Sequence, residues 1–512
     1  MEKKYKKQIY DRIIVTVLLL LFQIFWFAIL IFKLYTRSIY ITYGVSLLGF
    51  ACVLYIINKQ SNPSFKIGWI LLIAFLPVFG VLFYVLFGQN KPTKKMRFKI
   101  NESKRKIIGD ILQDESAEKA LRNESQRAAN TSQYIYNASN YPVYKNTDVK
   151  YYSIGEDMFS SMVEDLKSAE HFIFIEYFII SEGIMWNTIL DILVEKAKQG
   201  VDVRIIFDDM GNIALLPPKY EKTLEALNEN IKCFAFNSVV PLMAMRMNNR
   251  DHRKIMVIDG NIAYNGGINL ADEYINHNSP YGHWKDTGVR LCGSAVWSFT
   301  AMFLEMWNAY YKTDTDISKF RPLLNAIPKD AQGYIQPYSD TPVDNEPLGE
   351  NVYIELLSRA NRYAYIFTPY LILDNELRAA ICLASKRGVD VRIVTPGIPD
   401  KKIVYRLTRA NYKDLMDNGV KIYEYTPGFL HAKCMVCDDE VAVVGSINMD
   451  YRSLYLHFEC ATYMYKCPAV LDVKKDILLT IEKSHKVSID DLKKNIFARI
   501  FDSVLRVFEL LF

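Results

Sequence analysis

One motif occurs twice in this chain, with the same spacing in both copies. The pattern HxKxxxxDxxxxxxGxxN begins at His252 and again at His431, and its lysines are Lys254 and Lys433. A histidine and a lysine two residues apart point to the same face of a β-strand. Each copy therefore offers an imidazole beside a cation that suits a phosphate. Two copies that face each other could act on one phosphodiester.

The duplication extends upstream of the motif. The segment 198–205 recurs at 386–393 with the shared core Gly-Val-Asp-Val-Arg-Ile, and 231–234 resembles 420–423. Each repeat has the pattern of a strand, a helix that ends at a glycine, a strand, a helix, a strand and then the motif strand. This order predicts an α/β sandwich. We expect the two halves to pack as a pseudo-twofold pair with one shared active site.

The paired motif resembles that of the phospholipase D superfamily. Within it, the run 445–454, the first-copy run 265–269 and the hydrophobic leader resemble bacterial cardiolipin synthases, and the resemblance covers roughly residues 40–512. It implies two tandem phospholipase D-like α/β sandwich domains in pseudo-twofold arrangement, at residues 136–320 and 321–485. An all-α transmembrane leader is expected before them.

The leader, residues 1–90, contains three uncharged apolar stretches, at 13–32, 39–58 and 67–90. Each is long enough for a hydrocarbon core of about 30 Å. The first is too long for a signal peptide and lacks a small-residue cleavage site. The family's leader is usually a two-span hairpin, which matches the second and third stretches. We therefore expect two or three transmembrane helices, with the first stretch either a full span or an interfacial or re-entrant helix.

The formal net charge of +5 is mild, but the placement of the charges is informative. Residues 91–106 carry eight lysines and arginines against one glutamate, within a segment, 91–135, that is expected to be a basic linker. The positive-inside rule puts this segment, and with it the catalytic domains, at the cytoplasmic face of the cell membrane. Contact with anionic lipid is favoured over a solvated linker. The tail, 486–512, has the spacing of an amphipathic helix that packs on the core or, less favoured, lies at the interface.

The eight cysteines show no regular pairing, which indicates free thiols in a reducing compartment. Cys434 and Cys437 lie in the second motif strand, where residues an odd number of positions apart point to opposite faces. Joint metal ligation by these two is therefore unfavourable, and core packing is expected. No other histidine and cysteine cluster has zinc spacing, so the sequence predicts chemistry without a metal or cofactor.

A metal-free phosphodiester enzyme must neutralise the phosphoryl oxygens and divide the displacement into two steps. The two motif lysines supply positive charge, and the motif asparagines and one hydroxyl supply donors. The expected phosphate-binding residues are Asn269, Ser446 and Asn448. The first copy has Gly267 where the second has Ser446. We interpret this as a difference in the number of hydrogen-bond donors that the two copies offer to the phosphate.

The superfamily's usual order implies that His252 is the nucleophile and His431 the general acid and base, although pseudo-symmetry allows the reverse. Each imidazole needs a partner that sets its tautomer. Asp286 and Glu459 precede strand-like runs at comparable places in the two halves and are expected to orient the histidines. Asp259 and Asp438 complete the catalytic motifs, and the family treats them as mainly structural. The remaining histidines have no motif role and are expected to be structural or surface residues: His171, His277, His283, His457 and His485.

The acceptor decides the reaction. Water would give a phospholipase, and the glycerol of a second phosphatidylglycerol would give cardiolipin. The resemblance implies a membrane phosphatidyltransferase that condenses two phosphatidylglycerols to cardiolipin and glycerol through a phosphatidyl-histidine. A membrane-bound phospholipase D hydrolase and a phosphatidylserine synthase remain alternatives, and a lipid-binding scaffold is disfavoured because both motifs are intact. Phosphatidylglycerol, anionic lipids and the membrane are the expected partners. A nuclease is disfavoured because it would be soluble, with basic residues interleaved with aromatics, so no nucleic acid is expected.

Overall fold

The computed structural model describes most of the chain. The described residues are 39–59, 62–88, 92–238, 248–311, 316–322, 330–493 and 495–507, with a few single positions besides. The chain divides into two compact units, each described by itself below. One comprises 92–237 and 250–495, and the other comprises 1–91, 238–249 and 496–512.

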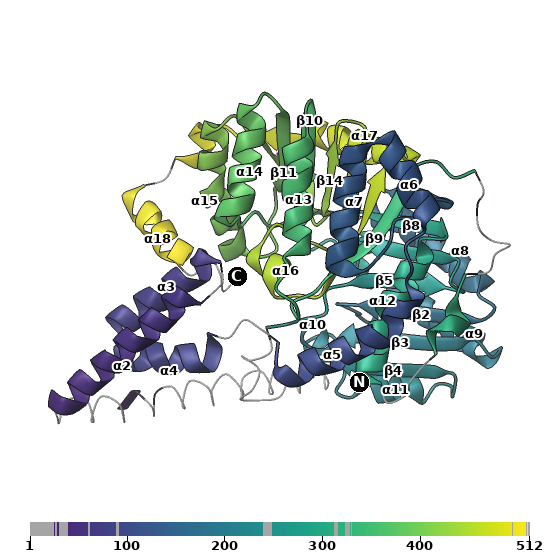
Figure 1. Cartoon of the computed structure of the whole chain (residues 1–512), viewed down its shortest axis with the longest axis horizontal. Coiled ribbons are helices and arrows are strands. Elements are labelled where there is room, and N and C mark those ends of the chain that lie inside the picture. The colour runs from purple at the N-terminus through teal and green to yellow at the C-terminus, as the bar shows by residue number, and fades with distance from the viewer. Residues whose placement is uncertain are drawn as a thin grey trace. The chain divides into compact units, whose positions relative to one another are not determined.

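The first half of the larger unit forms a seven-stranded mixed sheet (Figure 1). Its strands, in order across the sheet, are β1 (Thr147–Tyr152), β8 (Gly288–Gly293), β6 (Ile262–Gly266), β5 (Lys254–Ile258), β2 (Phe172–Tyr177), β3 (Asp202–Asp208) and β4 (Ile231–Phe236). β2, β3 and β4 run parallel, and the others pair antiparallel. The helices of this half are α8 (Gly155–Ser168), α9 (Ile184–Lys198), α10 (Asp209–Asn212), α11 (Tyr220–Glu225) and α12 (Val296–Tyr310).

The second half forms an eight-stranded sheet with the same strand order and one additional edge strand, β17. From the opposite edge of the sheet, its strands are β17 (Ser484–Lys486), β12 (Lys421–Tyr425), β11 (Asp390–Pro396), β10 (Tyr363–Phe367), β14 (Cys434–Cys437), β15 (Val441–Gly445), β16 (Glu459–Tyr465) and β9 (Tyr334–Asp340). The helices are α13 (Leu348–Arg359), α14 (Asn375–Lys386), α15 (Lys402–Asp417), α16 (Tyr451–Tyr455) and α17 (Pro468–Glu482). In Figure 1, α13, α14 and α15 lie side by side on one face of this sheet. The predicted α/β duplication is confirmed.

Local sequence explains the repeated units. Gly200 and Gly388 follow α9 and α14 with φ of 94° and 93°, a left-handed conformation that glycine adopts without steric cost. Alternate residues of the motif strands enter different cores. Cys434 belongs to the core shared by both sheets and Cys437 to the outer core of the second half, as the odd spacing predicted.

The last helix of each half joins the halves. α12 contacts β9 of the opposite sheet, and α17 contacts β1. Phe174 and Val257 of the first sheet share one buried cluster with Val436 and Val444 of the second. Burial of this shared apolar surface holds the two sheets together as one unit.

The segment expected to be a basic linker, 91–135, contains helices. These are α5 (Lys94–Ile107), the 3-10 turn η1 (Ile108–Asp110), α6 (Glu115–Glu124) and most of α7 (Gln126–Ser139). Met96, Ile100 and Ile107 are buried on one side of α5, which packs against α12, while α7 packs against α13. The segment folds and packs, and is not an extended linker, because its apolar residues recur at helical spacing and form one apolar stripe along the helix. The many charged residues between them make this stripe hard to recognise in the sequence.

The smaller unit is helical: α2 (Ile39–Asn58), α3 (Pro63–Phe75), α4 (Pro77–Phe87) and α18 (Ile496–Val507). The apolar stretch 67–90 is divided at Leu76, because Pro77 lacks an N–H group and starts a new helix. Among the residues that the structure describes, no helix combines the length and the apolar character that crossing a membrane requires. The first stretch, 13–32, lies almost wholly outside the described residues.

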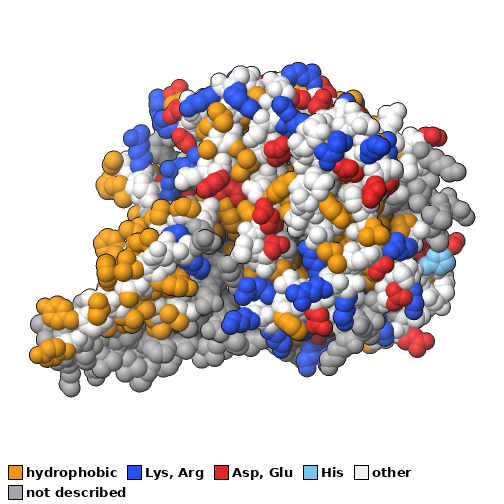
Figure 2. All heavy atoms as spheres, in the orientation of Figure 1, with side chains coloured by type: hydrophobic (Ala, Val, Ile, Leu, Met, Phe, Trp, Pro, Cys, Tyr) orange, Lys and Arg blue, Asp and Glu red, His pale blue; other side chains and the backbone are white. Residues whose placement is uncertain are grey.

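Many apolar side chains of this unit are exposed. Figure 2 shows them gathered over α2 and α3, where Leu47, Phe50 and Phe75 are at least 60 % exposed. Five apolar residues of α18 are between 50 and 79 % exposed: Ile496, Phe497, Ile500, Phe501 and Val504. Helix α18 covers Ile496–Val507, a shorter span than the helix expected over 486–512.

Candidate active site

The two motif histidines lie just before the motif strands and not within them. β5 begins at Lys254, and β14 begins after Lys433. The backbone N–H of His252 donates to the carbonyl of Phe458 (2.9 Å), and that of His431 donates to Lys285 (2.7 Å). Each histidine therefore sits on a segment that pairs with the opposite half of the unit.

Short strands guide one of these crossings. β13 (Gly428–Leu430) pairs in parallel with β7 (His283–Lys285) and leads directly to His431. In the other crossing Asp251 forms a bridge with Phe458. These backbone hydrogen bonds bring His252 beside Glu459, the residue that follows Phe458. They bring His431 beside Asp286, the residue that follows β7.

Those following residues are the expected orienting acids. His252 Nδ1 lies 2.8 Å from Glu459 Oε1, and His431 Nδ1 lies 2.6 Å from Asp286 Oδ2. Each carboxylate comes from the half that does not contain its histidine. An Nδ1–H group that donates to a carboxylate leaves the Nε2 lone pair free for chemistry. We call these contacts the crossed pairs.

The site is deeply buried. His252 and His431 are each 7 % exposed, and the two acids are fully buried. Burial, with Lys433 beside it, lowers the pKa of His431 to about 4, although Asp286 opposes this shift. Burial and Lys254 likewise lower the pKa of His252 well below its usual value. These shifts favour the neutral form of both imidazoles in the free protein.

The motif lysines turn toward the histidine backbones. Lys254 Nζ donates to the His252 carbonyl, and Lys433 Nζ donates to the His431 carbonyl. Burial lowers the pKa of Lys254 to about 8 and that of Lys433 to about 7. An anion between the two halves would favour the charged lysines.

The two motif asparagines differ in their surroundings. Asn269 is fully engaged, because its Oδ1 accepts from the Ile179 N–H (3.1 Å) and its Nδ2 donates to the Tyr274 hydroxyl (2.6 Å). Asn448 is also buried, but its Oδ1 has no hydrogen-bond partner among the described residues. This oxygen could accept a hydrogen bond from a hydroxyl group of a ligand, whereas phosphoryl oxygens, which only accept, would need the Nδ2 group of Asn448.

The Ser446 hydroxyl contacts the acid that pairs with His252. This hydroxyl donates to Glu459 Oε2 and accepts from the Cys460 N–H (3.1 Å). In the first half a Cβ at Gly267 would lie 2.2 Å from Asp286 Oδ1. The two equivalent positions therefore both face an orienting acid: Ser446 holds Glu459 by a hydrogen bond, and Gly267 leaves room for Asp286.

The motif aspartates lie away from the histidines, at the other ends of β5 and β14. Asp259 accepts three backbone N–H groups at 2.7–2.8 Å, from Glu170, His171 and Phe172. Asp438 accepts three at 2.7–2.9 Å, from Asn361, Arg362 and Tyr363. These carboxylates cap the turns that lead into β2 and β10, which is the structural role that the family resemblance implied.

Aromatic rings and a third histidine lie beside the motif histidines. The Phe178 ring lies 5.0 Å from the His252 ring, and the Tyr274 ring lies 5.5 Å from the His431 ring. The His457 ring lies 5.6 Å from His252. The position of His457, two residues before Glu459 on an extended segment, was the only sequence signal for it.

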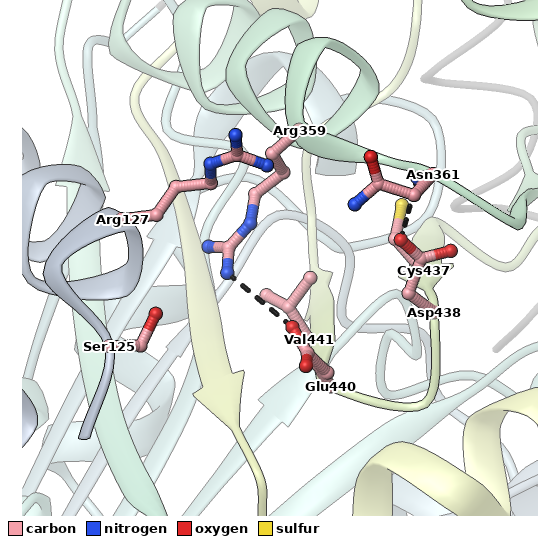
Figure 3. Close-up of a pocket in the computed structure, with 8 residues that line it drawn as sticks. All are labelled: Ser125, Arg127, Arg359, Asn361, Cys437, Asp438, Glu440 and Val441. Atoms are coloured by element: carbon pink, nitrogen blue, oxygen red, sulfur yellow. Dashed lines mark hydrogen bonds and ion pairs between the residues drawn. The ribbon is translucent and has the colours of Figure 1, made fainter.

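A pocket of about 220 Å³ lies at the far end of the β14–β15 hairpin (Figure 3). Arg127, Arg359 and Asp438 are among the residues that line it. No motif histidine or lysine lines this pocket. It is therefore separate from the candidate active site.

Comparison with known proteins agrees with this geometry. The family model described as "Cardiolipin synthase, PLD-like domain" matches residues 162–285 and 353–477, and a "Phospholipase_D-nuclease N-terminal" model matches 47–89. A cardiolipin synthase of Staphylococcus aureus is 35% identical over 84% of this chain and 87% of its own length. The chain belongs to the bacterial cardiolipin synthase family of the phospholipase D superfamily.

Two further proteins are similar to the chain described here. An uncharacterised protein of Streptococcus mutans is 46% identical over 86% of the chain and 95% of its own length. The structure of a phosphatidylserine synthase from Haemophilus influenzae covers 74% of this chain and 97% of its own, with a TM-score of 0.55 and 15% identity. At that identity the second likeness concerns the fold alone.

Gly267→Ala should displace the acid that orients His431. Because the added methyl group would lie 2.2 Å from Asp286 Oδ1, the carboxylate must move. A displacement of about 1 Å at a reacting group costs on the order of 100-fold in turnover, which we expect here. Gly109→Ala is the matched control, since no atom lies within 4 Å of its added Cβ. Wild-type turnover of the Gly267 variant would contradict the assigned role.

The buried lysines should limit activity at alkaline pH. Since kcat/KM reports the free enzyme, loss of the proton of Lys433, whose pKa is about 7, should steepen its fall with rising pH by about a further tenfold per pH unit. Lys433→Arg should move this fall to higher pH, because a guanidinium stays charged. Lys413→Arg, at a side chain that is 66% exposed, should leave the profile unchanged. An alkaline limb that Lys433→Arg does not move would exclude Lys433 as its origin.

Proposed function

We propose that this protein is a membrane phosphatidyltransferase that condenses two phosphatidylglycerols to cardiolipin and glycerol. The observation that carries the proposal is the crossed pairs, which present two buried, neutral imidazoles with Nε2 free. Membership of the cardiolipin synthase family supports the choice of substrate and acceptor. Hydrolysis by water and transfer to serine are the alternatives.

In the first step, His252 Nε2 attacks the phosphorus of one phosphatidylglycerol. A P–N bond forms, the bond from phosphorus to the glycerol oxygen breaks, and His431 donates a proton to the departing oxygen. The bound phosphodiester anion favours the protonated form of His431 that this step needs. Lys254 and Lys433 balance the charge of the phosphoryl oxygens.

In the second step, neutral His431 accepts a proton from a glycerol hydroxyl of another phosphatidylglycerol. That oxygen attacks phosphorus, the P–N bond breaks, and cardiolipin leaves while His252 regains its lone pair. Water must stay away from the intermediate. The aromatic rings beside the histidines, Phe178 and Tyr274, suit such exclusion.

The leader is proposed to hold the enzyme at the membrane, with the catalytic unit on the cytoplasmic face. Exposed apolar side chains on α2, α3 and α18 support contact with lipid. Lys94, Lys95, Arg105 and Lys106 are exposed on α5 and would attract anionic headgroups. Labelling of a cysteine introduced at Lys413, an exposed site, in sealed inside-out and right-side-out vesicles tests this. Labelling only from the outer face of the cell would contradict it.

The products of purified protein with phosphatidylglycerol test the reaction. We expect cardiolipin and glycerol in equal amounts, and high glycerol should convert cardiolipin back to phosphatidylglycerol, because the two steps are reversible. Excess chelator should leave the rate unchanged, since no step uses a metal. Phosphatidic acid as the main product would instead identify a hydrolase, and loss of activity with chelator would exclude the metal-free mechanism.

Covalent labelling tests the roles of the two histidines. With radiolabelled phosphatidylglycerol, His252→Ala should form no adduct, because the attacking nitrogen is absent. His431→Gln should still accumulate adduct, because attack on phosphorus can precede the slow, uncatalysed protonation of the leaving oxygen. Denaturing electrophoresis measures the label on the protein. The opposite pattern would reverse the two roles, and wild-type labelling in both variants would exclude a phosphatidyl-histidine at either residue.

A further inference from the structure

A third histidine lies beside one of the crossed pairs. His457 has a side chain that is 11% exposed, and its Nδ1 lies 3.7 Å from Glu459 Oε1. Both of its ring nitrogens are buried without a hydrogen-bond partner among the described residues. A buried polar group without a partner is costly and calls for a physical explanation. The mechanism above does not use this imidazole.

The geometry around His457 suits a tetrahedral metal ion. One donor atom from each of His252, His457 and Glu459 lies within 4.8 Å of the other two. Glu459 Oε1 is 2.8 Å from His252 Nδ1 and 3.7 Å from His457 Nδ1. Zinc bonds of about 2.0–2.1 Å at tetrahedral angles place ligand atoms about 3.3 Å apart, between these two distances. Two imidazoles and one carboxylate also form a common zinc ligand set.

The other crossed pair lacks this arrangement. Trp284 precedes Asp286 by two residues, as His457 precedes Glu459. Its ring lies 5.6 Å from His431, which equals the distance between the rings of His457 and His252. The two positions are therefore equivalent in the repeat. An indole has no lone pair for a metal, so only one half can hold an ion.

We propose that His252, His457 and Glu459 form an inhibitory binding site for Zn²⁺ or a similar borderline-soft divalent ion. The inhibitory effect rests on the proposed function of His252, whereas binding of the ion rests on the geometry alone. The fourth ligand would be water or an oxygen of a phosphate. The sequence did not indicate this site, because His252 is more than 200 residues from His457 and Glu459 in the chain.

The chemistry of imidazole explains the inhibition. In the crossed pair the proton of neutral His252 is on Nδ1, and the lone pair is on Nε2. An ion bound at Nδ1 uses the lone pair of that atom, so the proton moves to Nε2. A protonated Nε2 has no lone pair with which to attack phosphorus. One ion therefore separates Glu459 from its histidine and blocks the nucleophile.

The same surroundings select the kind of ion. Lys254 Nζ and Lys433 Nζ donate to the carbonyls of His252 and His431, and their positive charge beside the site repels any cation. An ion must offset this repulsion by strong bonds to nitrogen. Zn²⁺ forms such bonds, whereas Mg²⁺ and Ca²⁺ prefer oxygen ligands. We therefore expect inhibition by Zn²⁺ at concentrations at which Mg²⁺ and Ca²⁺ have no effect.

Ion binding and inhibition are measured separately on the full-length protein in detergent. Protein freed of metal is titrated with Co²⁺, and its visible absorbance reports tetrahedral binding without any substrate. Cardiolipin formation is then followed at buffered free Zn²⁺, with each variant compared with its own zinc-free rate. His457→Asn removes one ligand. His485→Asn is the control, because it removes an exposed imidazole that pairs with Asp491 at 2.9 Å.

We expect one Co²⁺ per chain, and His457→Asn should raise both the dissociation constant and the inhibitory Zn²⁺ concentration at least about tenfold. His485→Asn should change neither. X-ray absorption of the zinc-loaded wild type should show two imidazole ligands, which tests the site even if the asparagine variant does not fold. Equal inhibition of wild type and His457→Asn, or tetrahedral binding that His457→Asn does not weaken, would overturn the proposal. If Co²⁺ binds as expected but no cardiolipin forms, the proposed function fails and the metal site stands.

Discussion

The crossed pairs are the constraint on which the rest of the catalytic unit depends. Each motif histidine takes its orienting carboxylate from the opposite repeat, so neither repeat forms a complete site alone. The shared apolar core and the contacts of α12 and α17 with the opposite sheets keep the halves in register. A small slip between the sheets would break both pairs at once, because a hydrogen bond weakens steeply with distance and angle.

Burial determines the electrostatic state of the free site. Desolvation penalises charge, and here it acts on two imidazoles and two lysines within one buried region. A bound phosphodiester would reverse part of this penalty, because its negative charge lies between the cations. Lys285 offsets the desolvation penalty in another way, because its Nζ forms an ion pair with Asp476 Oδ1 at 2.9 Å inside the unit. The active-site lysines lack such a carboxylate at contact distance among the described residues, as a site for an anionic substrate requires.

The repeat is symmetric in its backbone and asymmetric in its chemistry. Gly267 and Ser446 face the two orienting acids in different ways, and Trp284 and His457 occupy equivalent positions beside the two motif histidines. In the proposed reaction, a single phosphodiester with a leaving group on one side and a nucleophile on the other requires two imidazoles with different roles. Side-chain differences of this kind allow one duplicated fold to provide them.

The sequence by itself determined the duplicated α/β fold and both HxK motifs, and it singled out Asp286 and Glu459, the acids that the structure places beside the histidines. These features depend on spacing along one strand or one repeat, where geometry follows directly from the chain. Tertiary structure alone decided which acid meets which histidine, that Ser446 binds Glu459, that α5 packs against α12, and that His457 adjoins His252. Most of these contacts join residues from distant parts of the chain. Such contacts depend on strand register and on the packing of whole sheets, which no local pattern of residues encodes.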